Sequence, residues 1–110
     1  MNNTIYTIDE IKRRITPVAQ KYNLAAVYLF GSYARGEATP ESDVDLLVDL
    51  TGSTVKGLIF GSLYNDLEEA LGINIDLITV ACLNQPIEYN SEKQFNETVL
   101  RERMMIYAAA

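Results

Sequence analysis

Residues 31–36 read GSYARG and are followed after five residues by SDVDLLV at residues 42–48, and these two segments carry the strongest structural signals in the chain. A continuous apolar run over residues 25–30 ends abruptly at the glycine and predicts a buried strand. Residues 43–50 alternate apolar and mostly acidic side chains, which predicts a second strand. Between them, residues 33–41 predict a turn of helix followed by a loop. A buried strand ending in Gly-Ser is therefore joined by a short connection to an acidic strand.

A helix is predicted before the first strand. Thr7 and Glu10 form the pattern of a capping box, and apolar residues at helical spacing follow it as far as residue 22. Pro17 interrupts this pattern. Either the helix kinks there, or Thr16 caps a second short segment with the proline at its first position.

Three further elements are predicted after the acidic strand. Residues 53–71 have helical periodicity and end at Gly72, which is typical of the residue after a helix. Residues 73–80 alternate again and predict a third strand. The apolar residues beyond residue 94 predict a C-terminal helix, or a helix plus a short strand.

The composition limits the class of protein. A chain of 110 residues with 48% hydrophobic content can bury one modest core, so we expect a single domain over residues 1–110. The net charge of −6 makes a long nucleic acid an unfavourable partner. The N-terminal residues resemble no leader, and no apolar run approaches the ~18 residues of a membrane span, so we expect a cytoplasmic protein.

Cysteine and histidine usage excludes two further kinds of site. With one cysteine, Cys82, and no histidine, the chain can assemble neither a zinc site nor a Cys-His nucleophile pair. We expect Cys82 to be a small buried or half-buried apolar residue.

Three aspartates are candidate metal ligands. Asp43 and Asp45 leave the same face of their strand roughly 6.6 Å apart, and their charges repel unless a cation such as Mg²⁺ lies between them. A bare Asp-x-Asp pair is more often two solvated residues at a strand entrance. Asp76, however, lies within an apolar strand, where an unpaired charge is unfavourable. If the second and third strands are neighbours, Asp76 can complete a metal cage.

The Gly31-Ser32 turn is a candidate phosphate site. It follows a buried strand and precedes a helical turn, so backbone N–H groups and the Ser32 hydroxyl can face an anion. A glycine is needed there because a Cβ would keep a phosphate from the backbone. The alternative is a plain strand-ending turn. Arg35 can contact a phosphate or pair with Glu37 or Glu41.

The two quoted motifs and their spacing resemble the signature of the minimal nucleotidyltransferase (MNT) domains of the DNA polymerase β-like nucleotidyltransferase superfamily. The resemblance implies an α+β nucleotidyltransferase fold, with a small mixed β-sheet of strand order 1-2-3 backed by helices. It also implies Mg²⁺-dependent transfer of a nucleoside monophosphate, with ATP as co-substrate and two metal ions.

The resemblance also assigns roles to residues. Nucleotide-binding residues would be Gly31, Ser32, Arg35 and Ser42, with the first two holding the β- and γ-phosphates. Asp43, Asp45 and Asp76 would be catalytic and metal-binding. Asp76 would hold the metal that activates the incoming hydroxyl, or accept its proton.

MNT proteins of this length are commonly partners of HEPN proteins in toxin–antitoxin pairs, so the resemblance implies an antitoxin that transfers AMP to a tyrosine of a HEPN-like toxin. The short chain and its acidic surface fit a basic protein partner, in a hetero-oligomer or with self-association. One alternative is a non-catalytic binding module that neutralises its partner by occlusion. Another is transfer to a small molecule such as an antibiotic.

Overall fold

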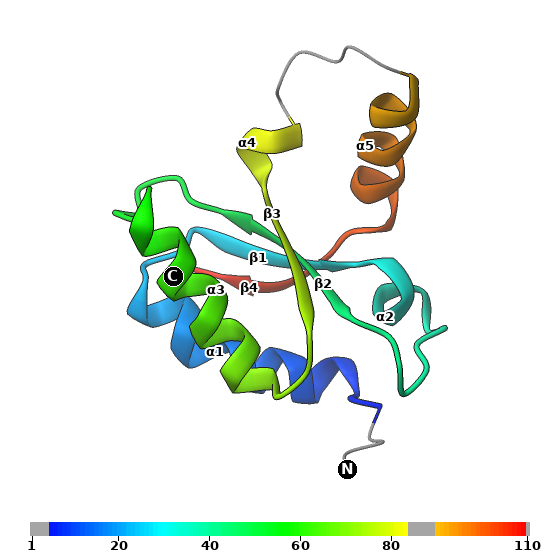
Figure 1. Ribbon diagram of the computed structural model, residues 1–110, viewed down its shortest axis with the longest axis horizontal. Helices are drawn as coiled ribbons and strands as arrows, with labels where there is room; N and C mark the ends of the chain where they lie inside the picture. Colours follow the sequence, from blue (N-terminus) through cyan, green and yellow to red (C-terminus); the bar gives the residue numbers. More distant parts are fainter. Residues whose placement is uncertain (1–4, 84–89, 110) are drawn as a thin grey trace.

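The computed structural model describes residues 5–83 and 90–109. Four strands form one mixed sheet in the order β3-β2-β1-β4 (Figure 1). β1 is antiparallel to both β2 and β4, whereas β2 and β3 are parallel. The predicted mixed sheet and its 1-2-3 order are confirmed, and the C-terminal region, left open by the sequence, forms a helix and the fourth strand. The strands are β1 (Ala26–Phe30), β2 (Val44–Asp49), β3 (Ile75–Thr79) and β4 (Met104–Ala108).

The first helix, α1 (Ile8–Lys21), begins with the predicted capping box. The Glu10 backbone N–H donates to Thr7 Oγ1 at 3.1 Å, and the Thr7 N–H donates to Glu10 Oε1 at 3.3 Å. Pro17 lies inside a single continuous helix. The alternative of a second segment capped by Thr16 is therefore wrong, and the Thr16 hydroxyl instead donates to the Lys12 carbonyl at 2.6 Å.

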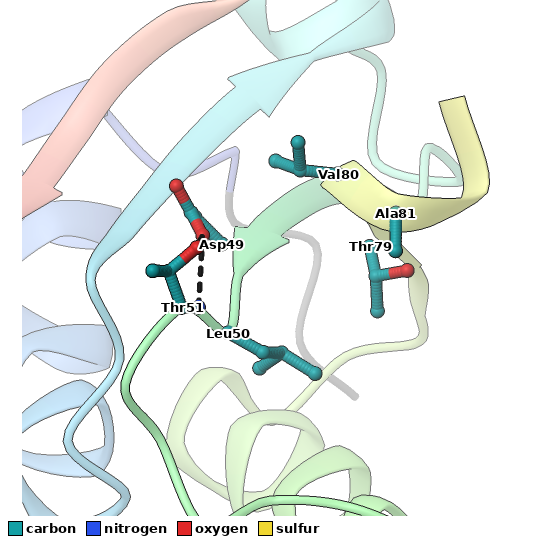
Figure 2. Close-up of a pocket in the computed structure, with 6 residues that line it drawn as sticks. All are labelled: Asp49, Leu50, Thr51, Thr79, Val80 and Ala81. Carbon is teal, nitrogen blue, oxygen red and sulfur yellow. Dashed lines mark hydrogen bonds between the residues drawn. The ribbon is translucent and has the colours of Figure 1, made fainter. Parts of the chain in front are cut away.

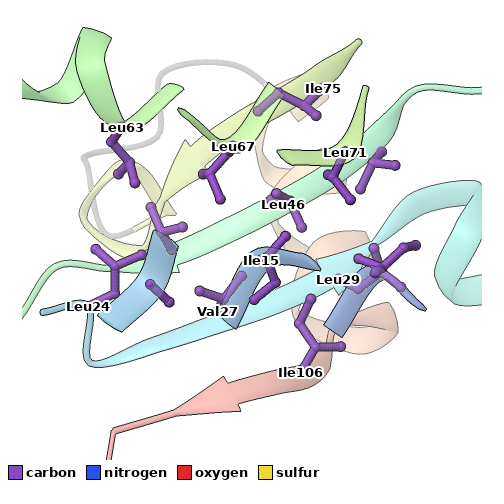
Figure 3. Packing of buried hydrophobic residues seen from close by; sticks show 14 of the residues in the cluster. Ile15, Leu24, Val27, Leu29, Leu46, Leu63, Leu67, Leu71, Ile75 and Ile106 are labelled. Carbon is purple, nitrogen blue, oxygen red and sulfur yellow. The ribbon is translucent and has the colours of Figure 1, made fainter. Parts of the chain in front are cut away.

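Side chains alternate between two apolar clusters on opposite faces of the sheet. One face of β1 and β2 packs against α1 and α3 (Leu58–Leu71) and forms the larger core (Figure 3). The other face forms a smaller cluster that includes Phe30, Leu47 and Val99, the last from α5 (Asn90–Glu102). The labelled residues of the larger core are Ile15, Leu24, Val27, Leu29, Leu46, Leu63, Leu67, Leu71, Ile75 and Ile106.

The helix α3 begins later than the predicted residue 53, because the preceding segment is an ordered loop. Gly57 has φ 59° and ψ −129°, which is not a helical conformation. Before it, Ser53 Oγ donates to the Tyr22 carbonyl at 2.6 Å and Val55 is buried in the core. The helix ends at Gly72 with φ 71°, as predicted.

The third strand is shorter than predicted, and a helical turn follows it. β3 covers Ile75–Thr79 and is followed by α4 (Val80–Leu83), which was not predicted. Cys82 lies on this turn and is exposed, so the expectation of a buried or half-buried cysteine is wrong. Its backbone N–H donates to Thr79 Oγ1 at 3.2 Å. This bond holds Cys82 on a turn at the end of the strand, where the residue is exposed. Within residues 5–83 and 90–109, no helix has both the length and the apolar character needed to cross a membrane.

Candidate active site

The register of the sheet brings two of the predicted aspartates together. Asp45 on β2 is the partner of Asp76 on the parallel strand β3, and Phe30 on β1 is the partner of Asp45 on the other side. By strand alternation, Asp45 and Asp76 share the face that carries Phe30 and Leu47. Asp43 lies one residue before β2 and is exposed. The conditional prediction that the second and third strands are neighbours is confirmed.

The electrostatics of Asp45 reflect this arrangement. Its pKa is raised from 3.8 to about 7, first by burial, then by hydrogen bonding to Asp76, and then by the negative charges of Asp76 and Asp43. The guanidinium of Arg35 acts in the opposite direction. A carboxylate in this position needs either a proton or a cation to offset the neighbouring acid.

Carboxylate oxygens are the ligands that Mg²⁺ prefers, so the chemistry of the acid pair fits that cation. In the described part of the chain, however, no three Asp, Glu, His or Cys side chains are already arranged to enclose a metal ion. Metal binding by Asp43, Asp45 and Asp76 together would therefore require their side chains to reorient around the ion.

Gly31 lies against Asp45 at the start of α2 (Gly31–Arg35), directly after β1. Its φ is 74°, and an added Cβ would lie 1.9 Å from Asp45 Oδ2. A glycine is thus required by the backbone conformation and by the neighbouring carboxylate, whereas the predicted reason was the access of a phosphate to the backbone. Ser32 follows it, and both residues are partly exposed. The turn predicted to bind phosphate therefore adjoins a carboxylate predicted to bind metal.

Arg35 connects this turn to the C-terminal helix. Its Nε lies 2.6 Å from Glu37 Oε1, and its Nη1 lies 2.9 Å from Glu102 Oε2 on α5. The predicted pairing with Glu37 is present, the partner on α5 was not predicted, and Glu41 is not among the ion-pair partners described for Arg35. Both acids raise the pKa of Arg35, mainly through the Glu102 hydrogen bond.

Ser42 shapes the loop before β2. Its Oγ accepts a hydrogen bond from the Thr39 N–H at 2.8 Å and lies 3.3 Å from the Thr39 hydroxyl. These contacts fix the loop that leads to Asp43. Nucleotide binding by Ser42 stays a prediction.

A pocket of about 340 Å³ opens beside the acid pair. It lies on the face of the sheet that α5 partly covers, and the ring of Phe95 on that helix meets Phe30 edge to face with centroids 6.3 Å apart. Phe95 was not predicted as a site residue, because helical periodicity does not reveal which strand a helix covers. The pocket is lined by Phe30, Asp45, Asp76, Leu77, Ile78 and Phe95.

A second pocket of about 250 Å³ lies at the other end of β2 and β3 (Figure 2). Asp49 lines it, and its Oδ1 accepts hydrogen bonds from the Thr51 N–H at 2.9 Å and the Thr51 hydroxyl at 2.6 Å. These bonds lower the pKa of Asp49. Asp49 is thus held in a local turn, away from the Asp45 and Asp76 pair.

Comparison with known proteins agrees with this geometry. Residues 11–105 match the family model described as a nucleotidyltransferase domain. Protein adenylyltransferase MntA of Thermococcus cleftensis is 35% identical over 101 residues, which cover 87% of this chain and 92% of that protein.

Two solved structures share the fold. A chain from a toxin–antitoxin crystal structure with AMP-PNP superposes with a TM-score of 0.65 at 20% identity, over 89% of this chain and 73% of that chain. A chain from the tri-AMPylated Shewanella oneidensis HEPN toxin in complex with its MNT antitoxin superposes with a TM-score of 0.61 at 17% identity, over 93% of this chain and 73% of that chain. With its nearly full-length family match, its acid pair and its glycine turn, the chain belongs to the nucleotidyltransferase domain family and, within it, to the protein adenylyltransferases.

Proposed function

We propose that the chain uses ATP and Mg²⁺ to transfer AMP to a hydroxyl group, foremost a tyrosine hydroxyl, of a HEPN-type toxin, and thereby acts as its antitoxin. The observation that carries this proposal is the pairing of Asp45 with Asp76 directly beside Gly31. A phosphate held at Gly31 and a cation held by the acid pair would then be neighbours, as a nucleoside triphosphate requires. The toxin–antitoxin structures described above, one of them with an AMPylated HEPN toxin, support the choice of acceptor.

Different residues would bind the donor nucleotide and the acceptor hydroxyl. The backbone N–H groups at Gly31 and the Ser32 hydroxyl would hold the terminal phosphates. Asp43, Asp45 and Asp76 would hold Mg²⁺, which when bound offsets the charge that develops on the phosphate oxygens. Asp76 is on the outermost strand of this side of the sheet. Because it is also exposed, Asp76 would be accessible to an incoming hydroxyl, and it would either hold the metal that activates that hydroxyl or accept its proton.

The transfer replaces one phosphorus–oxygen bond with another. The acceptor oxygen forms a bond to the α-phosphorus, while the bond from that phosphorus to the oxygen of the β-phosphate breaks. Pyrophosphate leaves with the electron pair, and the hydroxyl proton passes to the Asp76 carboxylate, or directly to water if Asp76 holds the metal. The product is an AMP group joined to the acceptor by a phosphodiester bond.

The net charge of −6 favours a basic protein as the acceptor. Complementary charge raises the rate of association at low salt and favours correct orientation. A docked protein also supplies the surface that positions its own hydroxyl, which accounts for much of the rate of such a transfer.

The test is transfer of labelled AMP to a purified HEPN-type toxin. Asp45→Asn and Asp43→Asn should each reduce transfer about 10²- to 10³-fold, because a carboxylate is lost where charge develops in the transition state. Asp49→Asn is the matched control, since it changes the same residue type on the same strand but outside the site. Its activity should stay near that of the parent.

Intact mass of the partner gives the second readout. Each AMP should add ~329 Da to the partner, and only with ATP and Mg²⁺ present. An unmodified partner that is nevertheless fully inhibited in the complex would contradict the enzyme proposal and favour neutralisation by occlusion. Transfer that is indifferent to Asp43 and Asp45 would remove the acid site from the mechanism.

A further inference from the structure

The pocket beside the acid pair has one apolar part and one acidic end. Phe30 forms part of it from β1, Ile78 from β3 and Phe95 from α5, while Asp45 and Asp76 are the charged side chains among its described lining residues. Ile78 lies two residues beyond Asp76 on the same strand and therefore on the same face. A group that entered this pocket would place its body against apolar side chains and its end at the carboxylates.

We propose that this pocket receives the aromatic ring of a tyrosine of the acceptor protein, with the phenol hydroxyl at the carboxylates of Asp45 and Asp76, and that Phe95 thereby selects aromatic over aliphatic hydroxyls. This inference rests on the proposed function and assigns the acceptor subsite within it. Serine and threonine hydroxyls stand on short side chains that would leave the apolar part of the pocket unfilled.

The pocket is large enough to admit a single aromatic ring. Its volume of about 340 Å³ lies near the lower end of the range for small-molecule sites, roughly 300–1,000 Å³. A complete nucleoside triphosphate with its phosphates at Gly31 would need space well beyond this pocket.

The polar groups of the pocket favour a phenol over adenine. In the ionised form that would bind Mg²⁺, the two carboxylates only accept hydrogen bonds, and a phenol hydroxyl can donate one. Adenine can donate through its amino group, but it presents the acceptor N1 or N7 beside that group. Those ring nitrogens would face acceptor carboxylates, and none of the described lining side chains is a neutral amide, a hydroxyl or a base that could donate to them.

Phe95 is held in place before any ligand arrives. The helix α5 is fixed to the sheet by buried Val99 and to the phosphate turn by the ion pair between Arg35 and Glu102. The ring of Phe95 already contacts Phe30 at an interplanar angle of 83°, yet 49% of the residue is exposed. It can therefore offer a ring edge or face to a second aromatic group with little loss of side-chain entropy.

The test uses N-acetyl-L-tyrosinamide as the probe, titrated into the ¹⁵N-labelled protein. Saturable amide shifts are expected at Ile78 and Phe95 with N-acetyl-L-tyrosinamide and not with N-acetyl-L-serinamide. Phe95→Ala should raise the Kd of the tyrosine probe between about two- and tenfold, the range for loss of an aromatic pair. Leu100→Ala is the matched control, because Leu100 is 50% exposed on the same helix but does not line the pocket.

Three outcomes would overturn the inference. They are equal binding of the serine probe, binding that Phe95→Ala leaves unchanged, and shifts at the pocket with adenosine but not with the tyrosine probe, which would make it a nucleobase site.

A thermal scan with ATP and Mg²⁺ distinguishes failure of the acceptor subsite from failure of the proposed function. If ATP and Mg²⁺ do not stabilise the parent, the proposed function fails. If they stabilise the parent and Phe95→Ala equally but the probe does not bind, only the acceptor subsite fails.

Discussion

Replacing Asp45 with asparagine should stabilise the protein at high pH when no metal is present. The pKa of Asp45 is raised from 3.8 to about 7 in the folded state. The folded state binds this proton more tightly than the unfolded state. The contribution of Asp45 to the free energy of unfolding is therefore fully present below pH 4 and is lost as the pH rises through 7. An asparagine side chain at this position carries no charge at any of these pH values, so Asp45→Asn removes this loss.

The size of the effect follows from the pKa difference. At 1.36 kcal/mol per pKa unit, a fully buried carboxyl group with this pKa shift would lose about 4 kcal/mol of stabilisation as the pH rises. Asp45 is only partly buried, so solvent screening reduces this to roughly 2 kcal/mol. For a domain of this size that amounts to about 8 °C in Tm. The difference between Asp45→Asn and the parent should therefore grow from near zero at pH 4 to about 8 °C at pH 8.5.

The assay is a series of thermal unfolding curves by circular dichroism in EDTA from pH 4 to pH 8.5. Asp49→Asn is the control, because hydrogen bonds from Thr51 lower the pKa of Asp49. Asp49 therefore titrates below pH 4, and the Tm difference between Asp49→Asn and the parent should stay nearly constant over this pH range. The stability that Asp49 contributes is present above the unfolded pKa and is lost as the pH falls through the folded pKa. Parallel pH profiles for the parent and Asp45→Asn would refute the reasoning.

Three further predictions concern the turn, the ligand and the first helix. Gly31→Ala should lower the free energy of unfolding, measured with urea, by more than the ~1–2 kcal/mol of a left-handed alanine, because its Cβ would collide with Asp45. Gly36→Ala has a similar φ of 73° and nothing within 4 Å, so it should show the conformational effect alone. ATP with Mg²⁺ at about 100 times Kd should stabilise the parent by ~2.7 kcal/mol in thermal scans, and a shift of equal size in Asp45→Asn would argue against a shared site. Thr7→Ala should cost about 1 kcal/mol in the same urea assay through loss of the capping box, whereas an unchanged midpoint would mean that the cap contributes nothing.

Local sequence patterns were enough to predict most elements of this fold. The capping box at Thr7, the strand that ends at Gly31 and the left-handed Gly72 each depend on a few neighbouring residues. The pairing of Asp45 with Asp76 needed one further assumption, that their strands are neighbours, which the sheet order confirms. Local chemistry and a simple topology therefore locate the acid pair.

Features that depend on tertiary packing were not predicted. Glu102 pairs with Arg35 from the far end of α5, and Phe95 reaches the pocket only because that helix covers the acidic face of the sheet. The start of α3 was placed too early because apolar spacing continues through the loop where Val55 is buried. Cys82 was judged by residue type alone, although its exposure follows from its place on a short turn at the end of β3.

The position of β4 affects how the sheet folds. β1 carries Phe30 and leads into Gly31, but its outer edge is covered by β4, the last strand in sequence order, whose Ile106 is buried in the larger core. Pairing between strands so distant in sequence forms late, because a long loop must close first. Until then β1 would present an open apolar edge, which invites aggregation. A chain that lacks β4 would therefore expose the edge of β1 and would be prone to aggregation.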